Sequence, residues 1–423
     1  MISADVIVVG SGAGGSVVSY NLVNQGFKVV LVDAGGDVGS ERARESFHPA
    51  LSSIEVLRCM CVGGTTLVSL GNMLITNAII ERIRALGIGL ENEVDEVCKL
   101  MRVTKVPQDK LPPFAKRFIE VAKESSLRVE IMPKSIDFSQ CIGCGKCAYG
   151  CPKNAKYTAL NLIRMCLQRG LVLLSRFVVK RLHRQHDGVI IEGVMDGSKI
   201  RAKCKALVLA AGALETPKLL TQIHDDEKIG RNLFVDPFIT LGGPYNGPSA
   251  AYGIQMAAYI DYDDFMLSPH YSGLLQFQLA AKGVDHKDRG IASIMIKVAD
   301  EGKGIVWPNG IIETRMTKKD LKILENGIGE AKKLLLELGV KDEEIVATHV
   351  RGAHPGGTAA IGYVVSRDLT INGCDGVFVA DASLIPPPLG KPPLLLIMSL
   401  AMKVAEKVRE YLQKKDVEKL NDA

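Results

Sequence analysis

Four cysteines lie close together near the middle of the chain, in the run Cys141-Ile-Gly-Cys144-Gly-Lys-Cys147-Ala-Tyr-Gly-Cys151-Pro152. The spacing C-x2-C-x2-C-x3-C-P is the ferredoxin-type ligand run, in which closely spaced thiolates on one loop wrap a cube of iron and sulfur. Zinc is the alternative metal, although zinc sites usually separate two cysteine pairs by a longer interval, and a metal-free structural loop is a third reading. We predict a [4Fe-4S] cluster bound by Cys141, Cys144, Cys147 and Cys151.

The fourth ligand of this cluster has an alternative. In two-cluster ferredoxins the last cysteine of such a run binds the other cluster. Only one run is present here, so we expect Cys151 to close the same cube. The remote candidates are Cys59 and Cys61, because Cys59-Met-Cys61 leads directly into a glycine loop, but each alone is typical of buried apolar packing.

A glycine-rich turn opens the chain between two apolar runs. Gly10-Ser-Gly12-Ala-Gly14-Gly15 follows one run and begins a helix-like segment, and the next run ends in Asp33. Such glycines allow a tight turn and close approach of the backbone to a pyrophosphate, while the acid is placed to bind a ribose hydroxyl. The pattern predicts a dinucleotide site rather than a purely structural turn, without separating FAD from NAD, and its predicted contacts are Gly10, Gly12, Ala13, Gly14, Gly15, Asp33 and Ala34.

Further segments follow in a fixed order: Val62-Gly-Gly-Thr-Thr66, Ala210-Ala-Gly-Ala-Leu-Glu-Thr-Pro-Lys-Leu-Leu220, Ile229-Gly-Arg-Asn-Leu233, His354-Pro-Gly-Gly-Thr358 and Val379-Ala-Asp-Ala-Ser383. With these segments the chain resembles the glucose-methanol-choline (GMC) oxidoreductases, a family of FAD-dependent alcohol oxidases and dehydrogenases. The resemblance covers most of the chain except residues 76–140 and 241–345. It implies FAD as the dinucleotide and adds these predicted contacts: Gly63, Gly64, Thr65, Val178, Ala211, Gly212, Asp381 and Ala382.

The resemblance also implies a catalytic base. In this family a histidine in the His-x-x-Gly-Thr segment takes the proton of the substrate hydroxyl while hydride passes from carbon to the flavin, and His354 matches that position. The chemistry suits imidazole because an alcohol is a poor hydride donor until its proton leaves, and imidazole titrates near neutral pH. The alternative is a histidine that only bonds the backbone of its turn. We expect His349 to be structural or to support the site indirectly.

Two positions depart from the family pattern. The second His or Asn that the family offers before its last helix falls on Pro392, whose side chain can form no hydrogen bond. Lys391 is the candidate replacement, as a cation near the reduced flavin, although a lone lysine usually points to solvent. Ser69 stands where the flavin loop usually has an asparagine. Both departures bear on alcohol oxidation more than on flavin binding.

The length of 423 residues suggests two or three domains. We predict an α/β fold in which an FAD-binding Rossmann-like domain accompanies a smaller α+β substrate domain built on an antiparallel sheet. The FAD-binding domain is expected to be discontinuous, at 1–75, 141–240 and 346–415, with the cluster loop at 141–156. Residues 76–140 form a predicted helical insertion, and residues 241–345 the substrate or cap domain.

Charge and hydropathy indicate which classes of binding partner are not expected. The 52 basic and 47 acidic residues are interspersed, and no basic run interleaved with aromatics indicates nucleic-acid binding. The start of the chain has no basic leader or cleavage site, and the apolar stretch 394–402 is too short for a membrane span. We expect a cytoplasmic protein without a membrane span, in a possible oligomer.

Together the motifs predict a dehydrogenase that oxidises an alcohol or hydroxy compound. A reduced flavin holds two electrons and an iron–sulfur cluster passes one at a time, so the expected acceptor is a ferredoxin-like protein or partner subunit. One alternative is the reverse flow, in which a ferredoxin drives reduction of an unsaturated or carbonyl substrate. Another is an electron-transfer subunit of a larger complex.

Overall fold

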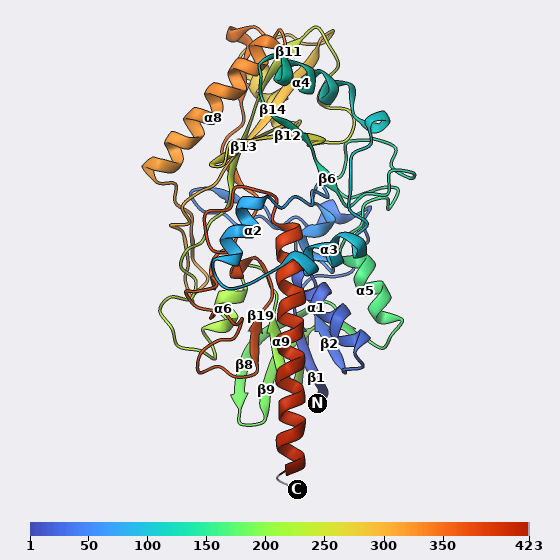
Figure 1. The fold of residues 1–423 in the computed structure, drawn as a ribbon, viewed down its shortest axis with the longest axis vertical. Coiled ribbons are helices and arrows are strands. Elements are labelled where there is room, and N and C mark those ends of the chain that lie inside the picture. Colours follow the sequence, from blue (N-terminus) through green and yellow to red (C-terminus); the bar gives the residue numbers. More distant parts are fainter. Residues whose placement is uncertain (422–423) are drawn as a thin grey trace.

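Two large sheets occupy opposite ends of the molecule (Figure 1). The computed structural model describes residues 1–421. The first sheet has the strand order β7-β2-β1-β10-β9-β8, with β19 also paired to β10. Its strands are β1 (Ile2–Val9), β2 (Val29–Val32), β7 (Val172–Leu174), β8 (Phe177–Gln185), β9 (Gly188–Met195), β10 (Ser198–Leu209) and β19 (Val377–Val379).

The apolar runs of the sequence form the centre of this sheet. β1 lies between β2 and β10, and all three are parallel. Residues on both faces of these strands are buried, as the lack of alternation in their sequences predicts. The faces are covered by helices that include α1 (Ala13–Asn24), which packs against α5 (Ala159–Leu167) and α9 (Leu394–Asn421).

The second sheet is mostly antiparallel, with the order β3-β18-β11-β14-β13-β12-β5 and β17 paired to β11. α4 (Pro113–Glu124) and α8 (Lys318–Glu337) share a hydrophobic core with it. Its strands are β3 (Glu55–Val56), β5 (Val129–Ile131), β11 (Pro237–Tyr245), β12 (Ala258–Asp261), β13 (Phe265–Pro269), β14 (Gly290–Val298), β17 (Val346–Ala347) and β18 (Arg351–Gly352).

The remaining regular elements are short. They are the helices α2 (Asn77–Arg84), α3 (Glu91–Leu100), α6 (Thr216–Leu220) and α7 (Leu274–Ala281), and the strands β4 (Thr104–Lys105), β6 (Pro133–Lys134), β15 (Ile305–Val306) and β16 (Ile312–Glu313). Short 3₁₀ turns begin at Ala43, Gly64, Gln108, Asp342 and Ala382.

The fold agrees with the predicted class: α/β, with a largely parallel nucleotide-binding sheet and an antiparallel second sheet. The second sheet also takes strands from outside residues 241–345, because β3, β5, β17 and β18 join it and β11 begins at Pro237. The chain ends in a long helix, α9, which continues to Asn421. Within residues 1–421 no helix has the length and apolarity needed to cross a membrane.

Candidate active site

A cavity of about 410 Å³ lies at the carboxyl ends of the parallel strands. Gly10 follows β1, Asp33 follows β2 and Ala210 follows β10, so the chain turns at one edge of the sheet. Open α/β sheets bind their ligands in this position. The predicted contacts that line the cavity are Gly10, Gly12, Ala13, Gly14, Asp33, Ala34, Gly64, Thr65, Val178, Ala211, Gly212, Asp381 and Ala382.

The glycines of the turn have two different roles. A methyl group at Gly14 would overlap the carbonyl oxygen of Ala380, and one at Gly15 would overlap the carbonyl oxygen of Gly10. A methyl group at Gly12 meets no protein atom within 4 Å. Gly14 and Gly15 therefore permit tight packing, whereas Gly12 leaves open space beside the start of α1, where unpaired backbone N–H groups favour a phosphate. This cradle fits the pyrophosphate of FAD.

Two buried carboxylates tie the loops around the cavity together. Asp33 accepts hydrogen bonds from the backbone N–H of Ser11 at 2.9 Å and of Gly35 at 2.8 Å. The hydroxyl of Ser11 donates to Asp33 at 2.5 Å and accepts from the N–H of Gly63 at 2.9 Å. Burial raises the pKa of Asp33. Gly63 lies behind the cavity wall, so its contribution is to hold the second glycine loop against the first.

Asp381 acts in the same way on the other side of the cavity. It accepts hydrogen bonds from the N–H of Gly212 at 2.8 Å and the hydroxyl of Thr216 at 2.5 Å. The N–H of Ser383 donates to its other oxygen at 2.8 Å. Burial raises the pKa of this carboxyl as well. The segments after β10 and β19 are thereby fixed together at the cavity.

A second cavity of about 230 Å³ adjoins the first and has a mainly apolar lining. Thr65, Arg58 and His354 line both cavities. The side chains that make the second cavity apolar are Phe47, Leu57, Val68, Leu70, Phe238, Met256, Met295, Leu394 and Ile397. A small number of polar groups in a mainly apolar pocket is typical of sites for small molecules.

His354 lines both cavities and contacts Asp236, which directly precedes β11, and Lys297, which lies in β14. Its Nδ1 lies 3.0 Å from the Oδ2 of Asp236 and 2.7 Å from the Nζ of Lys297, and its Nε2 lies 3.4 Å from the same Nζ. The other oxygen of Asp236 accepts a hydrogen bond from the N–H of Gly390 at 2.7 Å. A single ring nitrogen therefore has two competing partners, one cation and one carboxylate.

The electrostatics of this group keep the imidazole neutral. Burial, and after it the charge of Lys297, lowers the pKa of His354 to about 4. Burial also lowers the pKa of Lys297 to about 8, against the opposing effect of Asp236. Near neutral pH the site thus combines an uncharged imidazole, which can accept a proton, with a lysine that still carries its charge.

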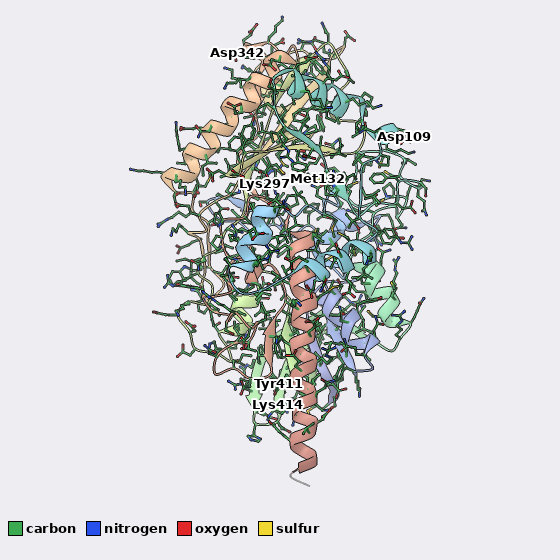
Figure 2. The ribbon with its side chains drawn as sticks, in the orientation of Figure 1. Asp109, Met132, Lys297, Asp342, Tyr411 and Lys414 are labelled. Carbon is green, nitrogen blue, oxygen red and sulfur yellow. The ribbon has the colours of Figure 1, made fainter. Side chains whose placement is uncertain are left out.

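Lys391 and Ser69 have different positions from His354. The ammonium of Lys391 forms an ion pair with Asp261 at 2.5 Å, donates to the carbonyl oxygen of Asp263 at 3.2 Å and lines neither cavity. Ser69 and Pro392 do line the apolar cavity. The lysine that lines the apolar cavity next to His354 is therefore Lys297, which lies in the middle of the molecule (Figure 2).

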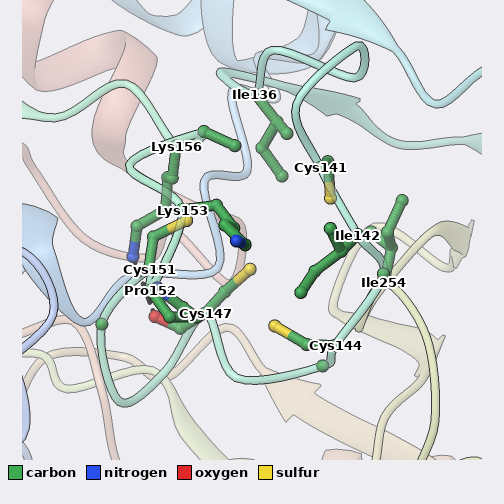
Figure 3. A pocket seen from close by; sticks show the side chains of 14 residues that line it. Ile136, Cys141, Ile142, Cys144, Cys147, Cys151, Pro152, Lys153, Lys156 and Ile254 are labelled. Carbon is green, nitrogen blue, oxygen red and sulfur yellow. Dashed lines mark hydrogen bonds between the residues drawn. The ribbon is translucent and has the colours of Figure 1, made fainter.

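The four cysteines of the central run line one cavity, and Figure 3 shows their sulfur atoms around the same space. All four are free thiols, and Gly143, Gly145 and Gly150, between them, have positive φ angles. However, no group of three or more His, Cys, Asp or Glu side chains placed to hold a metal ion is found among residues 1–421. The structure thus brings the four cysteines to one cavity without a converged ligand set, and the cluster stays a prediction.

Cys59 and Cys61, the alternative ligands, line the nucleotide cavity instead of the cavity at the cysteine run. Burial raises the pKa of Cys59 to about 12 and that of Cys61 to about 11. A fully buried cation, Lys156, connects the cysteine run with the apolar cavity, since its ammonium donates to the carbonyl oxygens of Cys147 at 2.8 Å and of Ser69 at 2.6 Å.

Three residues that contribute to these sites were missing from the sequence-based prediction: Asp236, Lys156 and Lys297. Lys297 gave one signal, because it is the only charged residue in the apolar strand β14. No signal in the sequence distinguishes Asp236 from other acidic residues at the end of a loop. Their association with His354 depends on sheet pairing rather than on local spacing.

Two family models described as GMC oxidoreductase match the chain, one over residues 4–238 and one over residues 312–401. The chain belongs to the GMC oxidoreductase family. It is therefore an FAD-dependent GMC oxidoreductase, of the enzyme class that acts on CH–OH donors. The open space beside Gly12 and the two buried carboxylates at the strand ends lie within the matched segments.

Relatives of this GMC oxidoreductase include an uncharacterized protein of Methanocaldococcus jannaschii, 33% identical over 96% of this chain and 100% of that protein. A long-chain-alcohol oxidase of Arabidopsis thaliana is 25% identical over 98% of this chain and 68% of its own length. Among solved structures, pyridoxine 4-oxidase from Mesorbium loti has a TM-score of 0.74 at 17% identity, covering 96% of this chain and 99% of that one. Formate oxidase has a TM-score of 0.72 at 14% identity, covering 98% and 99%. These structures share the fold.

Proposed function

We propose that this GMC oxidoreductase oxidises an apolar alcohol, with His354 as the base that removes the hydroxyl proton. The observation that carries the proposal is the position of His354, whose side chain lines both the nucleotide cavity and the apolar cavity. A general base must reach the proton that it abstracts, and a group at the junction of cofactor and substrate cavities meets that requirement. When bound, FAD supplies the acceptor for the hydride from the substrate carbon.

The protein's part in this reaction is to hold the base and to exclude water. Because its pKa is lowered to about 4, His354 is neutral at physiological pH and needs no prior deprotonation. The hydrogen bond between Nδ1 and Asp236 fixes the ring, so that Nε2 is the atom that accepts the substrate proton. The apolar walls from Phe238, Met256 and Met295 offer water few hydrogen-bonding partners in the cavity that His354 lines.

The substrate class follows from the lining of the second cavity and from the relatives. Its walls are aromatic, aliphatic and methionine side chains, which favour an apolar body attached to the hydroxyl group. One relative of this chain carries the name long-chain-alcohol oxidase. Within this scheme we assign residues 1–75, 141–240 and 346–415 to FAD binding and residues 241–345 to the substrate side, with 76–140 as an insertion between them.

The test is reduction of the bound flavin by alcohols in the absence of oxygen. We expect 1-octanol or benzyl alcohol to bleach the flavin of the FAD-loaded wild type, and His354→Ala to slow this step by about 10²- to 10⁴-fold. His349→Ala is the matched control, because His349 lies beside Glu55 outside both cavities. Bleaching at the wild-type rate in His354→Ala contradicts the proposal. Reduction of a carbonyl substrate by dithionite-reduced enzyme, with no bleaching by alcohols, indicates the reverse reaction.

A second proposal concerns the cysteine run, which we propose to bind a [4Fe-4S] cluster through Cys141, Cys144, Cys147 and Cys151. The supporting observation is that four free thiols line one cavity. A single zinc ion needs its ligands gathered at about 2.3 Å, whereas a cube spreads four thiolates over four irons. Four thiols spaced this closely on one loop therefore suit a cube better than a zinc site.

Such a cluster would pass electrons singly to an outside acceptor. We propose a ferredoxin-like protein as that acceptor, because Lys146 and Lys153 are exposed on the same loop and attract an acidic partner. The test is iron and acid-labile sulfide content after anaerobic purification. Cys147→Ser should lose the iron, while Cys98→Ser, at a thiol outside the run, should retain it. Stoichiometric zinc in place of iron refutes this proposal and leaves the flavin chemistry standing.

A further inference from the structure

Lys297 is a buried cation in an otherwise apolar strand. The sequence of β14 is Gly-Ile-Ala-Ser-Ile-Met-Ile-Lys-Val, and the lysine is only 2% exposed. Its ammonium contacts both nitrogens of His354 and lines the apolar cavity. Burial of an ammonium is costly unless it is compensated, so a lysine kept in this position needs a reason beyond packing.

We propose that Lys297 is the second catalytic group of the site, whose ammonium donates a hydrogen bond to the substrate oxygen while His354 takes the hydroxyl proton. This inference rests on the proposed oxidation of an alcohol at the same site. Pro392 lines the same cavity but has no hydrogen-bonding group to offer, whereas Lys297 brings a donor to it. The substrate oxygen would lie between the ammonium and the imidazole.

The atoms and electrons of the step balance without a further reagent. The O–H bond breaks and its proton passes to Nε2 of His354, while the C–H bond breaks and its hydride, two electrons with one proton, passes to the bound FAD. A C=O bond forms in the product. Lys297 keeps its protons throughout and stabilises the negative charge that develops on oxygen, as a donor in an oxyanion site does.

Other cations near the cavity are already neutralised. Arg58, which lines both cavities, forms an ion pair with Glu215 at 2.7 Å. Lys391 is paired with Asp261 at 2.5 Å. Lys297 has no ion pair within residues 1–421, although Asp236 lies close enough to favour its charged form. It is thus the cation best placed to serve a group that enters the cavity.

The charges around Lys297 predict an alkaline limit for the reaction. The carboxylate of Asp236, directly before β11, favours the charged form of Lys297, and the charge of Lys391 disfavours it. His354 contacts the ammonium directly. His270, which also lines the cavity, is kept neutral because burial lowers its pKa. With its pKa lowered to about 8, Lys297 is charged below that pH and loses its charge above it. Flavin reduction should therefore fall as the pH rises through about 8.

The test measures the pH profile of anaerobic flavin reduction in Lys297→Met and Lys297→Arg, with 1-octanol and benzyl alcohol as substrates. We expect Lys297→Met to slow reduction by about 10²- to 10³-fold and to lose the alkaline limb. Lys297→Arg should retain part of the rate with the limb moved beyond about pH 10, since arginine stays charged. Lys134→Met is the control for the structural effect of replacing a buried lysine, because Lys134 is also fully buried but lines neither cavity. This variant should keep the fall in rate at alkaline pH.

A second experiment measures binding of an alcohol to the FAD-loaded proteins, so that its result does not depend on turnover. Trifluoroethanol, whose hydroxyl is acidic, should bind the FAD-loaded wild type at least about tenfold more tightly than Lys297→Met in calorimetry. If wild type binds it in this way but no alcohol is oxidised, the contact stands and the proposed oxidation fails. An alkaline limb that persists in Lys297→Met, or equal binding of trifluoroethanol by both proteins, overturns the role of Lys297.

Discussion

The glycine turn offers a pair of substitutions that separate folding from cofactor binding. Gly14 and Gly12 lie two residues apart at the start of α1, and both line the nucleotide cavity. A methyl group at Gly14 would overlap the carbonyl oxygen of Ala380 and lie 2.7 Å from its carbonyl carbon. Carbon atoms in contact prefer about 3.5 to 4.0 Å, so the backbone must yield by about 1 Å or more.

The cost of this shift can be estimated. Overpacking of a close-packed core lowers the free energy of unfolding by about 1 to 3 kcal/mol. Because the methyl group of Gly14→Ala meets backbone rather than a flexible side chain, we expect a loss of about 3 kcal/mol or more. At about 2 to 4 °C per kcal/mol, we expect Tm to fall by roughly 6 °C or more. The change separates α1 from the segment after β19, which carries Asp381, so flavin binding suffers together with stability.

Gly12→Ala should behave differently, because its methyl group meets no protein atom and projects into the space reserved for the pyrophosphate. Its φ of −69° suits alanine. We expect the Tm of the flavin-free protein to stay within about 2 °C of wild type, while FAD affinity falls at least about tenfold, or about 1.4 kcal/mol. Thermal unfolding of the flavin-free proteins and FAD titration by fluorescence give both quantities. Normal flavin affinity in Gly12→Ala, or an unchanged Tm in Gly14→Ala, refutes this reasoning.

Three further predictions concern the groups around the cavities. Ser11→Ala removes the hydroxyl between Asp33 and the N–H of Gly63, and should cost about 1 to 3 kcal/mol in the free energy of unfolding, measured by urea titration; a cost near zero contradicts the bridge. Because the pKa of His354 is about 4, the rate of flavin reduction by alcohol should be flat between about pH 5 and 7, and a rise centred near pH 6.5 would instead indicate an unperturbed imidazole. Because the pKa of Lys297 is lowered in the folded protein, the unfolded chain binds more protons than the folded one above about pH 8. The Tm of wild type should therefore rise relative to that of Lys297→Met as the pH increases from about 7 to 9. Parallel curves of Tm against pH for the two proteins contradict a lowered pKa.

Local spacing explains how much of the cofactor site could be predicted. The turn from Gly10 to Gly15 and the acid at Asp33 belong to one strand, turn, helix and strand unit, whose geometry is determined by neighbours in sequence. The contacts predicted from this unit consequently line the cavity, except Gly15, which serves the packing behind it. The contacts in later segments were implied by the family resemblance and not by local spacing. The parallel sheet and the antiparallel second sheet likewise follow from continuous and alternating apolar patterns.

The group around His354 depends on long-range pairing that no local pattern encodes. In the second sheet Phe238 of β11 is paired with Lys297 on one side and with Arg351 on the other. This register brings Asp236, two residues before Phe238, and His354, three residues after Arg351, to the same end of the sheet. A shift of one residue would turn Lys297 to the opposite face. Alternation in sequence can indicate a strand, but it cannot say which strands are neighbours.

The central claim is that His354 and bound FAD together oxidise an alcohol in the cavity that they share. Its most direct test is stopped-flow reduction of the FAD-loaded enzyme, without oxygen, by benzyl alcohol with and without deuterium on the reacting carbon. The account predicts that the flavin is bleached in a single turnover, more slowly with the deuterated alcohol, and that His354→Ala abolishes most of the rate. A flavin that stays oxidised with every alcohol offered, or one reduced equally fast without His354, would contradict it.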